Sequence, residues 1–313
     1  MHPIHSLIVS VRRAAVLLMG LACIVGLSAC EEDVTAVTGT DLAYSLYGVV
    51  SPQLDTQWVR VFPIEGRLTP ASPEPLDADL TVTNRTTGES STMRDSIIAD
   101  FAGQYAHVFW SPLTAEHEHT YRIVARRSDG AESSVEVTVP MMSEIVVEAP
   151  RIRTNEVVLP VLVPGDIPRV VAAEAVFAVS YLPAGAPEIL TNSFSVPYYS
   201  EPHPVQEGWR VPIDLTAAFD DIRGQIAEDL EDAPLDSRVG VILLNVTARL
   251  IVANEAWNPP NGQFDAELIV QPGVMENVTD GFGFVGAGYR LSRQWAPPDT
   301  AVVRAGFRAP EDQ

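Results

Sequence analysis

Lysine is absent from this 313-residue sequence, so all 20 of its basic residues are arginines, and they are outnumbered by 41 acidic residues. The formal net charge of −21 leaves no surplus of cations to neutralise phosphates, which is the main source of affinity for nucleic acids. Anionic lipid headgroups would repel the same charge. We therefore expect no nucleic-acid partner, and any attachment to a membrane must come from something other than surface charge.

Cysteine is scarce as well, since the chain contains only Cys23 and Cys30. Cys23 lies in a charge-free segment, Ala14–Leu27, that follows Arg12 and Arg13. A charged stretch followed by an apolar one is typical of a secretory signal. The apolar segment is shorter than the roughly 20 residues of a membrane-spanning helix, which disfavours the alternative of an uncleaved anchor. Residues 1–29 are predicted to be a signal peptide.

The apolar segment ends in Leu27-Ser28-Ala29-Cys30, which resembles the lipobox of bacterial lipoproteins. In that family the cysteine is acylated and becomes the first residue of the mature chain. The resemblance implies a lipid on Cys30 and stable anchoring, because two acyl chains already suffice for it. It also leaves no cysteine for a disulfide, so the fold must rely on its own core. An ordinary secreted protein is the alternative, although its cleavage site requires a different pattern of small residues.

Residues 30–41 are predicted to be an acidic, lipidated tether that begins with Glu31-Glu32-Asp33. This acidic run is similar to the tag that exports some lipoproteins to the outer face of the outer membrane. The alternative is that it is only a solvated spacer. The expected location is the bacterial outer membrane, with the protein facing the exterior.

Residues 42–145 contain short segments with the alternating pattern of half-buried strands. The last two of them face each other across a turn at Asp129-Gly130, with Tyr121 near the start of the first. This order is similar to the final hairpin of immunoglobulin-like and fibronectin type III sandwiches, and it places Tyr121 at a tyrosine corner. We predict an immunoglobulin-like β-sandwich here. The predicted strands are Ala43–Val50, Gln57–Pro63, Leu80–Asn84, Gln104–Trp110, Thr120–Arg127 and Ser134–Val139.

Residues 146–313 are predicted to form a second β-rich domain that carries one amphipathic helix, so the fold class is mainly β. The helix is expected over Thr216–Glu231, where apolar side chains recur at helical spacing and Asp214 or Thr216 can cap the start. Its apolar stripe should lie against a sheet. The predicted strands are Ile145–Ala149, Glu156–Leu162, Val170–Leu182, Trp209–Ile213, Val239–Ala253 and Ala266–Val270.

Gly281-Phe-Gly-Phe-Val-Gly286 matches the dinucleotide-binding pattern GxGxxG letter for letter. That pattern binds a pyrophosphate only where a strand leads into a helix within a βαβ unit. Pro297 and Pro298 follow closely here, which leaves no room for such a unit. We instead predict a strand whose glycines allow a close backbone approach or a bulge, and no nucleotide cofactor.

The same region carries a more specific resemblance. Trp257-Asn-Pro-Pro-Asn-Gly262, Gln271-Pro-Gly273 and the glycine-rich run from Asn277 to Gly288 resemble the C-terminal signature of outer-membrane lipoproteins with a DUF4249-type domain. Members of that family look like lipoproteins with an immunoglobulin-like first half, and many are encoded near TonB-dependent nutrient receptors. The resemblance therefore implies a TonB-dependent receptor as a partner. It brings no catalytic residue.

No catalytic, cofactor-binding or metal-binding constellation is predicted. Glu116-His-Glu-His119 would place His117 and His119 on one face of a strand, but zinc needs further ligands that the sequence does not supply, and a polar approach to the next strand is the simpler interpretation. His107 and His203 have no nucleophile near them in sequence. The sequence contains no GxSxG, HExxH, SxxK or phosphate-binding loop pattern.

Aromatic residues in loops are the remaining candidates for ligand contact. Tyr198, Tyr199 and Trp257 lie near prolines and could offer flat faces to a sugar or peptide, or they could pin their loops to the core. The function predicted from sequence is a lipid-anchored, non-catalytic surface protein that serves as an accessory or binding module of a TonB-dependent-type uptake complex. The alternatives are a surface hydrolase with its site in the C-terminal domain and a structural envelope lipoprotein.

Overall fold

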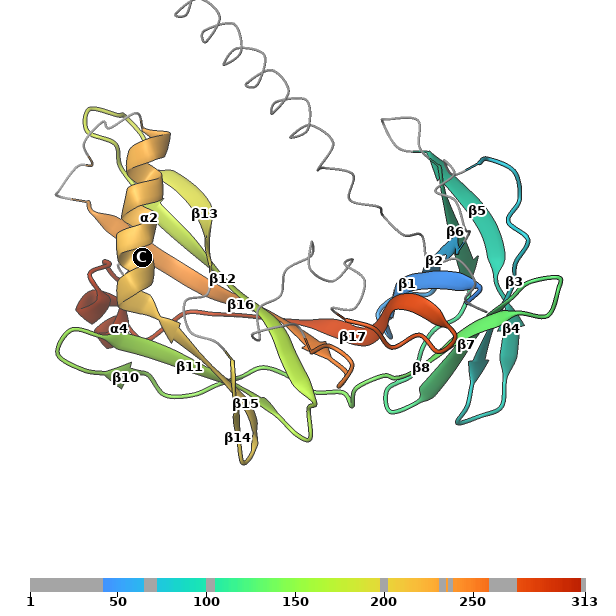
Figure 1. Ribbon diagram of the computed structural model, residues 1–313. Coiled ribbons are helices and arrows are strands. Elements are labelled where there is room, and N and C mark those ends of the chain that lie inside the picture. The colour runs from blue at the N-terminus through green and yellow to red at the C-terminus, as the bar shows by residue number, and fades with distance from the viewer. Residues whose placement is uncertain are drawn as a thin grey trace, which may run out of the picture. The chain divides into compact units, whose positions relative to one another are not determined.

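The computed structural model describes residues 42–64, 72–99, 105–197, 202–230, 235, 239–258 and 275–310 (Figure 1). Strands dominate these residues, which confirms the predicted mainly β fold class. No helix among them is long and apolar enough to cross a membrane. The predicted signal peptide, the tether with Cys30 and the predicted strand Ala266–Val270 lie outside the described residues.

The first half folds as the predicted immunoglobulin-like sandwich. Four strands, in the order β1-β2-β6-β5, form one end of an eight-stranded sheet, and β4-β3-β7-β8 form the facing sheet. Their inward side chains make one hydrophobic core in which Tyr44, Leu46, Val61, Leu80 and Ile123 are buried. The strands are β1 (Tyr44–Val50), β2 (Gln57–Pro63), β3 (Asp79–Asn84), β4 (Ser90–Thr92), β5 (Arg94–Ala99), β6 (Tyr105–Ser111), β7 (Thr120–Arg126) and β8 (Glu132–Thr138).

The second half has a separate hydrophobic core. Long strands β12 and β16 continue the eight-stranded sheet, and a five-stranded sheet is built around β11 and β15. The strands are β9 (Val146–Val147), β10 (Arg151–Ile152), β11 (Val157–Pro164), β12 (Arg169–Tyr181), β13 (Leu190–Pro197), β14 (His203–Val205), β15 (Gly208–Asp214), β16 (Val241–Ala253) and β17 (Gly281–Trp295).

The predicted helix is present as α2 (Leu215–Asp229). The Asp214 carboxylate accepts hydrogen bonds from the backbone N–H groups of Thr216 and Ala217, which is the expected N-cap. Ile222 and Ile226 are buried, as the apolar stripe requires. A second helix, α4 (Asp299–Ala305), corrects the prediction of a single helix. It has only seven residues, too few for a helical period to stand out in the sequence.

Strand β17 belongs to both cores. Its first half pairs in parallel with β1, where Val285 and Ala287 join the first core, and its second half pairs antiparallel with β16, where Tyr289 joins the second. In the first part of the chain, the first core ends at Val139 and the second core already includes Ile145, so the cores divide a few residues before the predicted border between residues 145 and 146. It omits β17, however, so the sandwich is not confined to residues 42–145.

The glycines of β17 allow the close backbone approach that the sequence predicts. A Cβ atom at Gly283 would lie 2.3 Å from the Leu46 carbonyl oxygen, and one at Gly286 would lie 2.1 Å from the Trp257 indole nitrogen. Gly283 also has a φ of +103°, which favours glycine. The GxGxxG run therefore lies within a packed strand that continues to Trp295, and it is not a turn from a strand into a helix.

Candidate ligand-binding surface

Aromatic and arginine side chains gather on the face of β1-β2-β6-β5 that points away from the sandwich core. Alternation along β2 produces this arrangement, because Val59 and Val61 are buried while Trp58 and Arg60 point the other way. We call this surface the aromatic–arginine face. It consists of Tyr47, Trp58, Arg60, Phe62, Arg94 and Trp110.

One row of the face crosses three neighbouring strands. Trp58 on β2 lies opposite Trp110 on β6, and Trp110 lies opposite Arg94 on β5. The two indole centroids are 6.0 Å apart with 33° between the ring planes. The Arg94 guanidinium carbon lies 5.2 Å from the Trp110 ring centroid, within cation–π range. Strands are spaced ~4.8 Å apart, so this row spans about 10 Å of open sheet.

A second row lies beside the first on the same face. Arg60 sits opposite Tyr47, and its guanidinium carbon is 4.3 Å from the centroid of the Phe62 ring. Burial raises the pKa of the Tyr47 hydroxyl, the nearby charge of Glu276 adds to that rise, and Arg60 opposes it. Arg60 is therefore close enough to the Tyr47 hydroxyl to influence its pKa.

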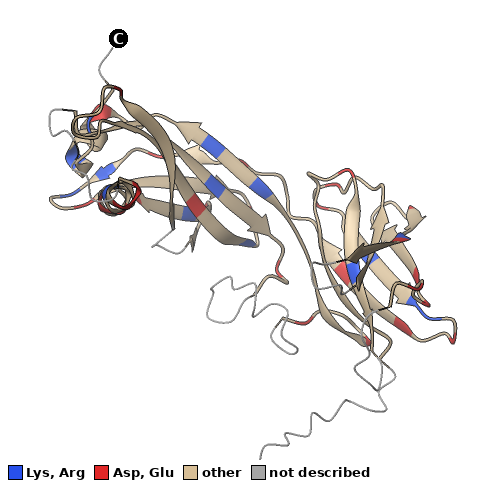
Figure 2. Ribbon diagram, turned by 90° about the horizontal axis from the view of Figure 1, so that it is seen from above, with Lys and Arg blue, Asp and Glu red and all other residues tan. Residues whose placement is uncertain are grey.

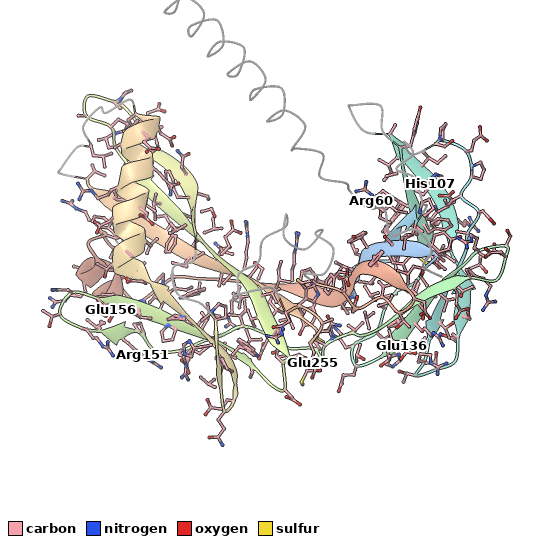
Figure 3. The ribbon with its side chains drawn as sticks, viewed as in Figure 1. Arg60, His107, Glu136, Arg151, Glu156 and Glu255 are labelled. Atoms are coloured by element: carbon pink, nitrogen blue, oxygen red, sulfur yellow. The ribbon has the colours of Figure 1, made fainter. Side chains whose placement is uncertain are left out.

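The described outward side chains of β1, β2, β5 and β6 include two arginines and no carboxylate, and the carboxylate that acts on the edge of the face is that of Glu276, near Tyr47. The other outward residues are neutral: Ser45, Val49, Ser96, Ile98, Ala106 and Val108. Among the described residues, neither Arg60 nor Arg94 forms an ion pair with a carboxylate, whereas Arg126 and Arg210 each do. Arginines and acidic residues are otherwise spread thinly along the strands (Figure 2). Arg60 projects from β2 among the side chains at this end of the sheet (Figure 3).

Of the three residues predicted from sequence for ligand contact, only Trp257 lies in the described part of the chain. Tyr198 and Tyr199 lie outside the described residues. Trp257 is only 8% exposed, and its ring packs edge-to-face on Phe284 at a centroid distance of 5.0 Å. The ring is fixed in a small core with Ala253 and Met275. Trp257 is thus a packing residue and not an exposed platform, which corrects its tentative assignment as a ligand contact.

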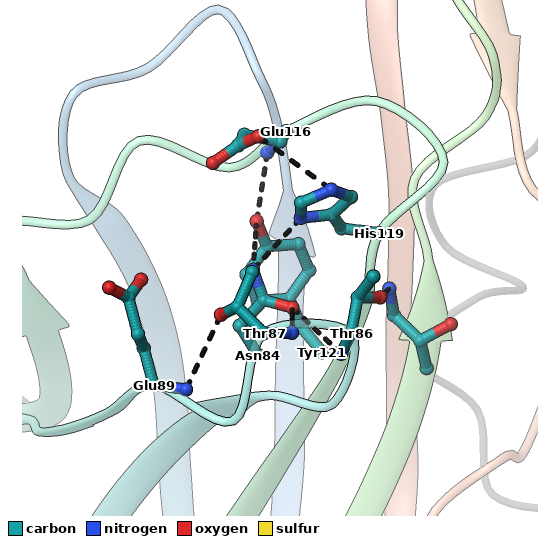
Figure 4. Close-up of polar contacts among 8 residues, drawn as sticks. Asn84, Thr86, Thr87, Glu89, Glu116, His119 and Tyr121 are labelled. Carbon is teal, nitrogen blue, oxygen red and sulfur yellow. Dashed lines mark hydrogen bonds and ion pairs between the residues drawn. The ribbon is translucent and has the colours of Figure 1, made fainter.

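Tyr121 forms the predicted tyrosine corner (Figure 4). Its hydroxyl accepts a hydrogen bond from the Glu116 backbone N–H at 2.8 Å, five residues upstream. The Asn84 side-chain amide lies 2.9 Å from His119 Nδ1 and 3.4 Å from the Tyr121 hydroxyl. The Asn84 side-chain oxygen meanwhile accepts from the N–H groups of Thr86 and Thr87. These bonds tie the turn after β3 to the start of β7.

The two histidines considered for a metal are used separately. His119 belongs to the Asn84 network, and its Nε2 lies 3.6 Å from the Glu116 carboxylate. His117 instead hydrogen-bonds the Pro140 carbonyl at 2.8 Å, and its ring meets Tyr289 edge-on. In the part of the chain that the structure describes, no three His, Cys, Asp or Glu side chains are grouped to hold a metal ion.

His107 and Asp95 form a pair that resembles part of a catalytic dyad. The Nδ1 of His107 lies 2.9 Å from the Asp95 carboxylate, but its Nε2 lies 3.0 Å from the Ser72 carbonyl oxygen. The ring is 5% exposed, and both of its nitrogens have protein partners. This pair therefore has no nitrogen available to take a proton from a substrate, and it joins β5, β6 and the chain near Ser72.

A wide pocket of about 470 Å³ lies between β13 and α2 in the second half. Its lining is polar and acidic and includes no histidine: Asn192, Ser193, Phe194, Gln225, Glu228 and Asp229. Acidic side chains on the exposed face of a helix are ordinary solvated surface, so this pocket has no feature that specifies a ligand.

No protein-family model and no curated protein sequence matches the chain. Among solved structures, it is similar to a pullulanase from Anoxybacillus sp. LM18-11 in complex with maltotriose, with 8% identity over 66% of this chain and a TM-score of 0.20. The matched region is 24% of that enzyme's length, so this chain corresponds to about a quarter of it. It is also similar to bovine butyrophilin, with 12% identity over 82% of this chain and 99% of butyrophilin, again with a TM-score of 0.20. Likenesses this weak carry no argument about activity.

Proposed function

We propose that this protein is a lipid-anchored, non-catalytic binding module of the bacterial outer membrane, attached through Cys30 and facing the exterior. The observation that carries the binding role is the aromatic–arginine face, where Trp58, Trp110 and Arg94 form an open row on a sheet. Exposed aromatic rings beside arginines are typical of surfaces that bind partners.

The anchoring part of the proposal rests on sequence. Leu27-Ser28-Ala29-Cys30 supports lipidation, and Glu31-Glu32-Asp33 supports export to the outer face. The resemblance of the C-terminal run to lipoproteins with a DUF4249-type domain supports a role beside a TonB-dependent receptor. In this role the module would capture a nutrient at the cell surface and deliver it to the receptor.

Lipidation is tested by intact mass spectrometry of the protein extracted from membranes with detergent. We expect a mature chain that begins at Cys30 and carries acyl chains. Cys30→Ser should abolish the acylated form, whereas the matched control Cys23→Ser should leave it unchanged, because Cys23 is predicted to leave with the signal peptide. An unmodified N-terminus upstream of Cys30 would overturn the anchoring proposal.

The uptake role is tested by co-purification from detergent-solubilised membranes, and the outward orientation by adding a protease to intact cells. We expect recovery of a TonB-dependent receptor with the lipoprotein, and loss of the lipoprotein on protease treatment. Recovery without any stable partner would contradict the uptake role. Protection in intact cells that disappears on lysis would contradict the outward orientation.

A further inference from the structure

The geometry of the aromatic–arginine face restricts the ligands that it can hold. Trp58 and Trp110 lie side by side on neighbouring strands, with ring centroids 6.0 Å apart, on the outward face of the sheet, and we call this pair an aromatic shelf. Trp58 remains 44% exposed, which leaves apolar ring surface available to a ligand. A peptide anchor binds best in a desolvated pocket, whereas a pyranose ring can lay its flat C–H face on such a shelf.

Arg94 and Arg60 further restrict the ligands that the aromatic–arginine face can hold. Arg94 lies over Trp110 and Arg60 lies over Phe62, so each guanidinium is held at the border of the aromatic surface. An arginine presents a planar fork of N–H donors that matches the geometry of a carboxylate. The described outward side chains of the four strands include no carboxylate. The guanidinium groups of Arg60 and Arg94 therefore have no acidic partner among these side chains.

Charge distinguishes a saccharide chain from a membrane surface as the occupant. The whole protein has a formal net charge of −21, so a broad anionic surface would repel most of it. A single oligosaccharide contacts only the aromatic–arginine face, where the outward side chains of the four strands include Arg60 and Arg94 and no carboxylate. The face therefore suits a narrow anionic ligand better than an anionic lipid surface.

We propose that the aromatic–arginine face binds an acidic polysaccharide, with uronate rings stacked on Trp58 and Trp110 and their carboxylates paired with Arg94 and Arg60. This inference rests on the proposed function and names the class of ligand that the binding module takes. It does not depend on the identity of the receptor.

The test measures binding of the full lipidated protein in detergent micelles by isothermal titration calorimetry, with four probes. Polygalacturonate has both a pyranose ring and a carboxylate. Its fully methyl-esterified form keeps the ring and loses the charge, and poly-glutamate keeps the carboxylate and lacks the ring. Glycerophosphoglycerol, the soluble headgroup of an anionic lipid, presents the charge of a membrane surface without a bilayer into which the acyl chains could insert. We expect binding of polygalacturonate alone, with at least tenfold weaker binding of the other probes.

Two variants test whether polygalacturonate binds to the aromatic–arginine face. Trp58→Ala and Arg94→Gln should each weaken polygalacturonate binding by about tenfold or more, as expected for residues at the centre of an interface. Arg126→Gln is the charge-matched control on β7, in the other sheet of the sandwich, and should leave binding within about twofold, since Arg126 already pairs with Glu132. Arg94→Gln retains the aromatic rings, so it tests the arginine even if the tryptophan variant folds poorly.

Several results would overturn the inference. Equal binding of the methyl-esterified polymer would indicate a neutral saccharide, and equal binding of poly-glutamate would indicate an acidic peptide. Binding of glycerophosphoglycerol alone would indicate a contact with lipid headgroups. Absence of binding to all four probes, or binding that survives both variants, would exclude this face as an acidic-saccharide site. None of these outcomes would affect the mass spectrometry and co-purification that test the proposed function.

Discussion

Trp58 and Trp110 lie directly opposite each other on β2 and β6, with ring centroids 6.0 Å apart, on the face of the sheet that points away from the core. Their chain neighbours Val59 and Phe109 also lie opposite each other, but on the buried face. The same two strands thus support a hydrophobic core on one side and an open aromatic surface on the other.

Because one aromatic side chain is exposed and the other is buried, we expect their substitution by alanine to lower the free energy of unfolding by different amounts. Trp58→Ala should lower the free energy of unfolding by less than about 1 kcal/mol, because it removes an exposed cross-strand pair. Phe109→Ala should lower it by about 3–5 kcal/mol, because it opens a cavity in the core. Urea unfolding monitored by circular dichroism measures both. Equal losses would show that Trp58 has a structural role.

Tyr121→Phe should destabilise the sandwich by about 0.5–1.5 kcal/mol, because it removes the part-buried hydrogen bond that the Tyr121 hydroxyl accepts from the Glu116 backbone N–H. Tyr105→Phe is the control, since no hydrogen bond to the Tyr105 hydroxyl occurs among the described residues. Thermal unfolding of the two variants provides the comparison. A stable Tyr121→Phe variant would mean that the corner is not needed to join β3 to β7.

Two aspartates at opposite ends of α2 should respond in opposite directions. Asp214→Ala removes the N-cap and should cost about 0.5–2 kcal/mol of stability. Asp229→Ala removes a negative charge from the C-terminal end of the helix and should stabilise the protein by about 0.3–1 kcal/mol at low salt. Denaturant midpoints at low and high salt separate the two effects, because salt should reduce only the second. Destabilisation by both variants would argue against this account of the helix ends.

Gly283→Ala should be strongly destabilising, because a Cβ atom there would overlap the Leu46 carbonyl and the backbone has a positive φ. Gly224→Ala is the matched control in α2, where no atom lies within 4 Å of an added Cβ. It should stabilise the protein by about 1 kcal/mol, the difference in helix propensity. Differential scanning calorimetry should therefore show shifts of opposite sign. A neutral Gly283→Ala variant would contradict the close pairing of β1 and β17.

Alkaline pH should destabilise the fold through buried tyrosines. Burial raises the pKa of Tyr289 to about 12, and burial together with the charge of Asp77 raises the pKa of Tyr44 to about 12. An unfolded chain loses these protons near pH ~10, so it binds fewer protons than the folded chain between these values. The free energy of unfolding is therefore unaffected by these groups below pH ~10 and falls as the pH rises toward about 12.

Tyr289→Phe isolates one of these groups. The variant loses the hydrogen bond from the Tyr289 hydroxyl to the Met141 carbonyl, which lowers its stability at neutral pH. Its stability should nevertheless fall less steeply than that of the parent protein above pH ~10. Unfolding by urea at a series of pH values measures the slope, and Tyr105→Phe serves again as the control. An unchanged slope would show that Tyr289 titrates normally.

The local pattern of the sequence was enough to predict most elements. Alternation predicted the hairpin of β7 and β8, and the similarity of this hairpin to the last one of immunoglobulin-like sandwiches predicted the tyrosine corner. The 3.6-residue period with its cap predicted α2. Edge strands were missed: β5 and β13 have many exposed residues on both faces, so their sequences show little alternation. The site could have been predicted in part, because alternation from Gln57 to Pro63 puts Trp58 and Arg60 on one face of the strand and two valines on the other face.

Long-range pairing could not be predicted in the same way. The glycine pattern indicated a strand with close neighbours, but nothing local to Gly283 identifies Leu46 as the residue it approaches. Trp257 illustrates the same difficulty, since only the contact with Phe284 distinguishes a packed tryptophan from an exposed one. Likewise, Trp110 and Arg94 become neighbours of Trp58 only when β5, β6 and β2 pair.

The shared strand β17 has a consequence for biogenesis. Gln53 and Arg290, 237 residues apart, exchange hydrogen bonds beside the pairing of β1 with β17. During synthesis from the amino terminus, β1 would have an unpaired edge until β17 followed. Non-local pairing of this kind is slow, and unpaired edges favour aggregation. Such a protein would need protection from aggregation until the whole chain is available, and truncation before β17 should leave material that is degraded.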